Sequence, residues 1–263
     1  MKAEGWFRAA EENLHGHLLS LAQCPGSRSL VRPYLELFDF GGADIPEFNL
    51  AYLKRKDGLV LDEALETCRA FFSHPGRRYI TNAPGLEPEL IRRGWQEEDP
   101  FLAMHLDLAR LPKRAEASAE IEIRSVEDEE GMDDLSSVLC SSWNISPAHW
   151  DGVFEVLRGI EIGARSAFRG HVLYASGHPI SSLLIFTQGK IAGVQLVSTL
   201  PAQRGRGWAS RLLVEALQVA RDGGATDSVL EATRMGAGSY ERLGFEGCGW
   251  SRYLSPPQRH NAD

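Results

Sequence analysis

The sequence has few cysteines and none arranged as a metal or redox motif. The four present, Cys24, Cys68, Cys140 and Cys248, are widely separated and include no C-x-x-C pair. This spacing excludes the usual cysteine-based zinc motifs and a disulfide-rich scaffold, and is typical of reduced thiols in a cytosolic protein. We therefore expect no metal site and a cytoplasmic location.

The sequence also lacks an excess of positive charge and an apolar run suited to a membrane. Its 28 lysines and arginines stand against 36 aspartates and glutamates, which gives a net charge of −8. The longest uncharged run, residues 170–189, contains Gly177, His178 and Pro179 and alternates like β-strands. The first twelve residues include five charged side chains, so we expect no signal peptide. Neither nucleic acid nor a membrane is expected as a partner.

What is present is a chain long enough for two domains. Its 263 residues are 43% hydrophobic, and single cores stop growing at about this length. Residues 109–120 are small, polar and charged, which is typical of an exposed linker. We predict one domain over residues 1–110, a linker over 111–119, a second domain over 120–255 and a disordered tail over 256–263.

Hydrophobic periodicity predicts helices and strands in both halves. In the first half we expect helices at 1–20, 61–72 and 87–93 and strands at 30–40, 48–53 and 101–108. In the second half we expect strands at 121–123, 171–175, 180–187, 191–199, 228–233 and from 245, with helices at 127–139, 147–158, 207–221 and 239–243. This order predicts an α+β fold built on mixed sheets.

Residues 197–209 predict an anion-binding turn. Pro201 ends a strand, and a glycine-rich turn then opens directly into an amphipathic helix. Glycines let backbone N–H groups converge, and a helix N-terminus offers unpaired donors and partial positive charge. Arg204 and Arg206 add flexible positive charge, so the stretch suits a pyrophosphate. It is not a P-loop or a Rossmann fingerprint, because it has no G-K-[ST] and no third glycine.

A second motif follows, and the two together resemble the GNAT superfamily of acyl-CoA-dependent N-acyltransferases. The family's [QR]-x-x-G-x-[GA] loop matches residues 204–209, RGRGWA, and its Y-x-x-x-G-F signature matches residues 240–245, YERLGF. The order of elements over residues 121–254 is also similar to that family. The resemblance covers roughly half of the chain.

The resemblance implies roles for the residues of both motifs. The backbone of Val197, Ser198 and Thr199 would pair with the pantetheine arm of acetyl-CoA. Backbone amides of the loop would hold the pyrophosphate; the loop consists of Arg204, Gly205, Arg206, Gly207, Trp208 and Ala209. Tyr240 would act as the general acid that protonates the departing thiolate.

The resemblance does not supply a general base for this chain. An alkyl amine has a pKa of about 10 and must lose a proton before it attacks. Many relatives carry a glutamate on the fourth strand, but residues 190–200 contain no carboxylate. Glu231 is the candidate substitute, and His171 and His178 are weaker candidates. A solvated or salt-bridged role for Glu231 is the alternative.

The first half resembles a degenerate copy of the second. Residues 63–69 parallel residues 215–221, and residues 90–95 parallel residues 240–245, at similar separations. The first copy lacks the glycine-rich loop and has Leu90 at the position of the tyrosine. We therefore predict two GNAT-like domains, each a mixed, mostly antiparallel sheet flanked by helices, of which only the second is catalytic. The first would wall the substrate cleft or cover a sheet edge.

The function implied by the resemblance is N-acetyl transfer from acetyl-CoA, a co-substrate, to a primary amine of a small molecule or protein by direct attack. One alternative is a non-catalytic acyl-CoA sensor, which the missing fourth-strand carboxylate favours and the tyrosine signature opposes. Another is a transferase for a longer acyl group or an aminoacyl group. The identity of the acceptor stays open, and a homodimer is compatible with these features.

Overall fold

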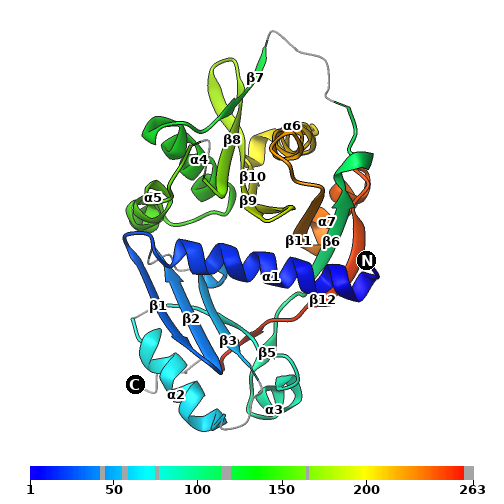
Figure 1. Ribbon diagram of the computed structural model, residues 1–263. Helices are drawn as coiled ribbons and strands as arrows, with labels where there is room; N and C mark the ends of the chain where they lie inside the picture. Colours follow the sequence, from blue (N-terminus) through cyan, green and yellow to red (C-terminus); the bar gives the residue numbers. More distant parts are fainter. Residues whose placement is uncertain (42–44, 55–58, 75–76, 114–119, 164–165, 258–263) are drawn as a thin grey trace.

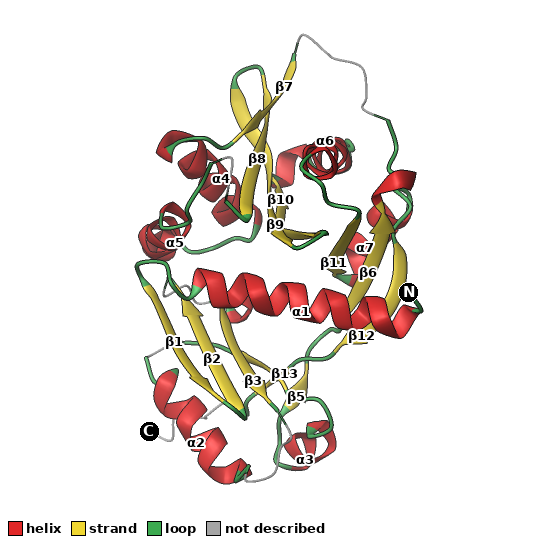
Figure 2. Cartoon of the chain, in the orientation of Figure 1, coloured by secondary structure: helices red, strands yellow, loops and turns green. Residues whose placement is uncertain are grey.

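The computed structural model describes residues 1–41, 45–54, 59–74, 77–113, 120–163 and 166–257. Most of the predicted linker and tail lies outside these residues. The described residues form two mixed sheets flanked by helices (Figures 1 and 2), which confirms the predicted α+β class.

The first sheet has the strand order β1-β2-β3-β4-β13-β5. Its strands are β1 (Ser27–Arg32), β2 (Leu35–Phe40), β3 (Asn49–Leu53), β4 (Ile80–Asn82), β5 (Gln96–Glu97) and β13 (Leu254–Ser255), and its helices are α2 (Leu61–Phe71) and α3 (Glu87–Arg92). The prediction of a single strand over 30–40 is wrong. Pro33 and Tyr34 form a turn there, because proline presets a turn and cannot donate to the ladder, so β1 and β2 are an antiparallel hairpin.

The second sheet has the order β12-β6-β11-β10-β9-β8-β7. Its strands are β6 (Phe101–Asp107), β7 (Ile121–Ser125), β8 (Phe168–Ala175), β9 (His178–Gln188), β10 (Ile191–Thr199), β11 (Asp227–Ala232) and β12 (Glu246–Ser251), and its helices are α4 (Glu129–Ser142), α5 (Trp150–Arg158), α6 (Trp208–Asp222) and α7 (Arg234–Glu241). α7 begins earlier than predicted because the Thr233 hydroxyl caps it, accepting from the Gly236 N–H at 3.1 Å.

The two sheets exchange one strand each. β6 precedes the predicted linker, yet it lies between β11 and β12 of the second sheet. β13 ends the second half, yet it lies between β4 and β5 of the first. The exchanged strands occupy equivalent places, so the two sheets have matching strand orders. The domain boundary at residues 111–119 stays a prediction. The sheets do not follow it, because each contains one strand from the other side of the boundary.

Helix α1 (Ala3–Leu21) lies between the two sheets (Figure 1). Leu18 and Leu21 pack in one core with Phe38 and Phe40 of the first sheet and with strands of the second. α6 and α7 pack together with alternate residues of β11 in a separate core, whereas Val229 of β11 contacts the α1 side. The faces of β11 are therefore divided between α1 and the α6–α7 pair.

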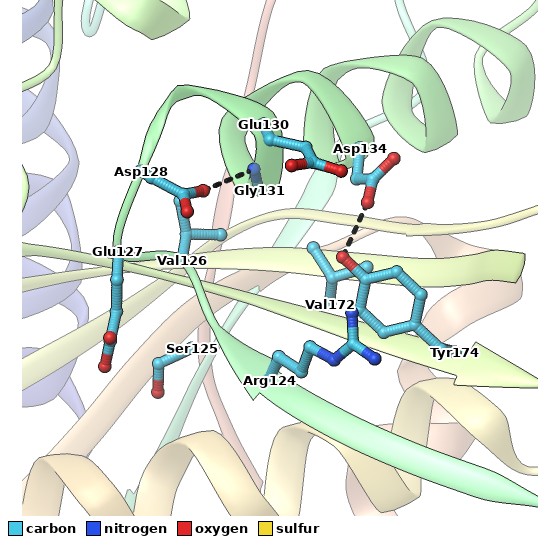
Figure 3. Close-up of a pocket in the computed structure, with 10 residues that line it drawn as sticks. All are labelled: Arg124, Ser125, Val126, Glu127, Asp128, Glu130, Gly131, Asp134, Val172 and Tyr174. Atoms are coloured by element: carbon cyan, nitrogen blue, oxygen red, sulfur yellow. Dashed lines mark hydrogen bonds between the residues drawn. The ribbon is translucent and has the colours of Figure 1, made fainter. Parts of the chain in front are cut away.

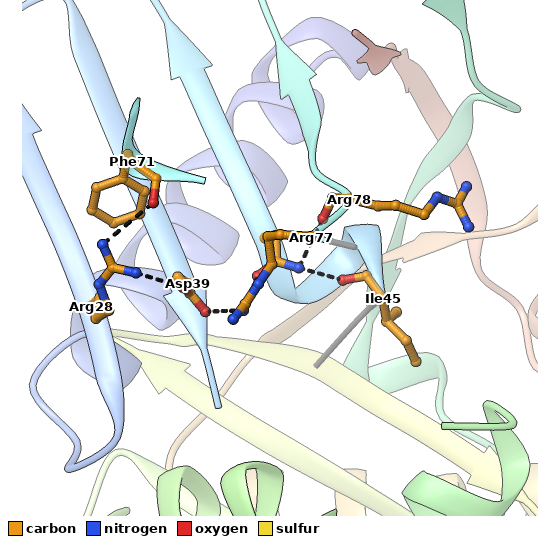
Figure 4. Close-up of polar contacts among 7 residues, drawn as sticks. Arg28, Asp39, Ile45, Phe71, Arg77 and Arg78 are labelled. Carbon is orange, nitrogen blue, oxygen red and sulfur yellow. Dashed lines mark hydrogen bonds and ion pairs between the residues drawn. The ribbon is translucent and has the colours of Figure 1, made fainter. Parts of the chain in front are cut away.

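An ion-pair network around the buried Asp39 joins strands β1 and β2 to the end of α2 (Figure 4). Asp39 is 3% exposed, and its carboxylate contacts Arg77 at 2.7 Å and Arg28 at 3.5 Å. Arg28 also donates to the Phe71 carbonyl at 3.3 Å. Because two arginines compensate this carboxylate, we assign the network to stability of the first sheet.

Candidate active site

β10 and β11 are paired only where they begin. Their parallel register ends at Gly193 and Val229, although both strands continue beyond those residues. β10 has a bulge after Gln195, and Leu196 within it has a φ of 54°. A bulge bends its strand and increases its twist. The sheet is therefore open between the last residues of β10 and β11, where an extended ligand can add to a strand.

The three residues predicted to pair with pantetheine, Val197, Ser198 and Thr199, lie beyond this bulge. Ser198 and Thr199 remain in register with β9, so the opposite edge of β10 faces the opening. The Ser198 hydroxyl accepts a hydrogen bond of 3.0 Å from the Trp143 indole at the end of α4. This hydrogen bond links α4 to β10, on the same face of the sheet as α1.

The glycine-rich loop leads into the first turn of α6. Gly205 and Gly207 have φ angles of 75° and 78°, which favour glycine. A Cβ at either position would meet no described protein atom within 4 Å. Trp208 and Ala209 form the half-buried start of the helix. Open space in front of helix N-terminal amides fits the pyrophosphate of a CoA ester.

Arg204 anchors the loop, so the expectation of a flexible charge is corrected for this residue. Its guanidinium donates to the Thr199 carbonyl at 3.2 Å and to the Ser142 carbonyl at 2.6 Å. The loop is thus tied to the ends of both β10 and α4. Arg206 is exposed and is the remaining cation of the loop.

Tyr240 lies on α7, on the α6–α7 side of the second sheet. Its ring packs edge-on against Phe245 at 5.9 Å between centroids. Burial raises the pKa of Tyr240 to about 12. The hydroxyl therefore keeps its proton at neutral pH and can act as a donor.

Glu231 lies on β11, two residues beyond the last pair with β10, and faces α1. Ser251 donates a hydrogen bond to one carboxylate oxygen, and Tyr253 donates to the other at 3.2 Å. Burial, aided by the charge of Glu11, raises the pKa of Glu231 to about 7, although these two hydrogen bonds oppose the shift. It has no ion pair within the described residues, and a carboxylate that titrates near pH 7 suits a general base.

A cavity of about 240 Å³ opens beside Glu231, and its walls come from both halves of the chain. The groups that line it include Glu11 and His15 of α1, Tyr52 of β3, Asn82 of β4 and Tyr253. The first half therefore forms a wall of this cavity. No sequence signal pointed to Ser251, Tyr253 or Glu11, because they are separated from Glu231 along the chain.

Glu231→Gln is expected to stabilise the protein at high pH. The carboxyl has a usual pKa of 4.5 and a pKa of about 7 in the folded chain, so raising the pH between these values favours unfolding. Glutamine removes this penalty, of up to about 3 kcal/mol. In thermal unfolding, the Tm advantage of the variant should grow from pH 5 to pH 8. The exposed Glu241→Gln is the control, and an advantage independent of pH would contradict the raised pKa.

A larger cavity, of about 400 Å³, lies at the far edge of the same sheet (Figure 3). Tyr174 donates to Asp134 at 2.7 Å, and Asp128 caps α4 by accepting from the Gly131 N–H at 2.9 Å. The cavity borders β7, which is the outermost strand and is separated from β10 by β8 and β9. Asp128 serves the start of α4 and Asp134 binds Tyr174, so we do not assign the cavity to the reaction.

The two histidines considered as alternative bases do not border the opening. His171 lies on β8, beyond β9, and burial together with the charge of Arg169 lowers its pKa to about 4. His178 is exposed at the start of β9. Glu231 is the one of the three candidates that lies beside the end of β10.

No described helix has the length and apolar character needed to cross a bilayer. Within the described ranges, no group of three or more histidine, cysteine or carboxylate side chains is arranged to hold a metal ion.

The second half matches the family model described as an acetyltransferase (GNAT) domain, over residues 179–248. A comparison with curated proteins found no match. Among solved structures, a GCN5-related N-acetyltransferase from Kribbella flavida aligns with a TM-score of 0.67 and 20% identity, covering 97% of this chain and 98% of that one. A GCN5-related N-acetyltransferase-like protein from Streptococcus suis aligns at 0.58 and 16%, covering 97% and 99%.

A tandem GNAT protein from the clavulanic acid biosynthesis pathway also aligns, with a TM-score of 0.56 and 15% identity over 88% of this chain and 83% of that one. The likeness to these structures extends over both sheets and confirms the predicted GNAT-like two-domain fold. Residues 179–248 therefore match a GNAT acetyltransferase domain, and the chain has a two-domain fold of GNAT type.

Proposed function

We propose that this chain transfers the acetyl group of acetyl-CoA to a primary amine. The observation that carries the proposal is the opening between β10 and β11, with Glu231 on the unpaired part of β11, on the α1 side, and Tyr240 on the α7 side. A base and an acid on opposite sides of one opening are the two proton-transfer groups that this reaction requires.

The loop and the strand end would position the donor. Amides at the start of α6 bind the pyrophosphate, with Arg206 as an additional cation. The free edge of β10 pairs with the pantetheine arm, as in the addition of a strand. The thioester then lies in the opening, where groups from both faces of the sheet reach it.

The acceptor would approach through the cavity beside Glu231. The Glu231 carboxylate accepts a proton from the ammonium group, and the neutral amine attacks the thioester carbonyl, forming the C–N bond. When the C–S bond breaks, the Tyr240 hydroxyl donates its proton to the leaving thiolate, and the proton that the new amide nitrogen loses returns to the tyrosine. Each positioned proton-transfer group contributes a factor of about 10²–10⁴ to the rate.

Glu231 also weighs against the alternative of a non-catalytic acyl-CoA sensor. The argument for a sensor depended on the lack of a carboxylate on β10, and the neighbouring β11 carries one just beyond its last pair with β10. Rates with acetyl, butyryl and longer acyl-CoA donors distinguish acetyl transfer from transfer of larger groups.

Acetyl-CoA is expected to raise the Tm of the wild type and not of Gly207→Ala. A ligand at one hundred times its Kd adds about 2.7 kcal/mol of stability, which is worth several degrees. A methyl group at Gly207 projects into the space in front of α6 and blocks the pyrophosphate.

Gly177→Ala is the matched control. Gly177 has a φ of 79°, close to the 78° of Gly207, and equally open surroundings, but it lies in the turn between β8 and β9. Both variants therefore carry the same backbone strain, and only Gly207→Ala should lose the response to acetyl-CoA. If the wild type itself shows no shift at millimolar acetyl-CoA, the proposed function is wrong.

A further inference from the structure

The charges around the cavity beside Glu231 are unbalanced. Among the described residues that line it, Lys54 is the one lysine or arginine. Its ammonium group lies 2.6 Å from one oxygen of the buried Glu36, and His15 lies 2.6 Å from the other. Burial favours the neutral acid, but these two contacts outweigh it and lower the pKa of Glu36. Glu36 is therefore ionised and neutralises Lys54.

Among the described residues that line the cavity, none gives the remaining carboxylates such compensation. Glu12 pairs with Arg8 at 2.8 Å on the exposed side of α1. Glu11 is half-buried and forms no ion pair with any described residue. Burial, together with the charge of Glu12, raises the pKa of Glu11, and Glu11 in turn raises the pKa of Glu231. Both carboxyl groups also line the same cavity, so one ligand within it can reach both.

Apolar surface also lines this cavity. Leu14 of α1, Leu53 of β3 and Pro84 contribute to its walls together with the Tyr52 ring. Such walls suit methylene groups, whereas the two carboxyl groups suit ammonium groups. The volume of about 240 Å³ suits a small molecule.

From this arrangement we infer that the acceptor is a short aliphatic diamine, with its reacting amine at Glu231 and its second ammonium group at Glu11. This inference depends on the proposed function and specifies its substrate class. Two positive charges on the acceptor match the two uncompensated carboxyl groups, and the methylene chain between them covers the apolar walls. Glu11 is then a binding residue that the first half of the chain contributes to a site in the second.

The test compares putrescine with n-butylamine, which has the same carbon chain and one amine fewer. With wild-type protein and acetyl-CoA, kcat/KM for putrescine should exceed that for butylamine by about tenfold or more, the factor that corresponds to one partly buried ion pair. Glu11→Gln should reduce this ratio towards one, mainly through KM for putrescine. Glu4→Gln, an exposed glutamate on the same helix, should leave the ratio unchanged.

The outcomes separate this inference from the proposed function. Equal rates for both amines, or an equal loss for both in Glu11→Gln, would overturn the diamine assignment and leave amine acetylation standing. If putrescine is not acetylated by a protein whose Tm still responds to acetyl-CoA, the diamine assignment is wrong and the donor site stands. If acetyl-CoA produces no response at all, the proposed function itself fails.

Discussion

Tyr240→Phe is expected to lower kcat by about 10²- to 10⁴-fold while the Tm response to acetyl-CoA is retained. The phenylalanine keeps the edge-on packing against Phe245 and removes only the hydroxyl. A thiolate must then leave without a proton from the protein, so the loss falls on turnover and not on binding. Steady-state kinetics together with thermal unfolding measure the two effects separately.

Tyr34→Phe serves as the control for this experiment. Tyr34 lies in the turn between β1 and β2, in the other sheet and far from Tyr240 along the chain. The Tyr34→Phe variant should therefore retain full activity. If Tyr240→Phe turns over as fast as the wild type, the assignment of Tyr240 as the general acid is wrong. If it loses both turnover and the response to acetyl-CoA, the tyrosine serves binding.

A chain that ends at Arg252 is expected to lose at least about 3 kcal/mol of stability and most of its activity. This truncation removes Leu254, 0% exposed between β4 and β5, and Tyr253, 4% exposed. Burying one side chain of this size contributes about 1.5–3 kcal/mol. Tm should fall by roughly 6 °C or more. A chain that ends at Pro257 keeps both residues and is the matched control.

Tyr253→Phe separates the packing of this segment from its hydrogen bond. The Tyr253 hydroxyl bond to Glu231 lowers the pKa of that carboxyl, so its removal should raise the pKa further and shift the lower limb of the rate profile to higher pH. The packing of the ring against Phe101 is retained.

Equal stability of the chains that end at Arg252 and at Pro257 would contradict the importance of the exchanged strand β13.

The strand exchange explains why the end of the chain matters for the site. Residues between β12 and β13 cross from the second sheet to the first, and on the way Ser251 and Tyr253 bind Glu231. β6 crosses in the other direction and pairs with β11, with Ala103 opposite Glu231. The strand that carries the proposed base is therefore held by segments from both halves.

The sequence by itself determined the parts of the site that depend on local backbone geometry. The loop over residues 204–209 requires glycines at positive φ before a helix, and the signature over residues 240–245 combines a short helix with a following strand. Both patterns are contiguous in the sequence, so they can be recognised without any knowledge of distant contacts. The elements of the second half follow from hydrophobic periodicity for the same reason.

Only the tertiary structure decided the sheet in which β6 and β13 lie and the surroundings of Glu231. A strand has the same periodicity in either sheet, so its pattern does not reveal its neighbours. The raised pKa of Glu231 results from burial and from contacts with residues such as Glu11 and Tyr253, which lie far from it along the chain. Desolvation and long-range charge depend on where distant segments meet, and folding alone brings those segments together.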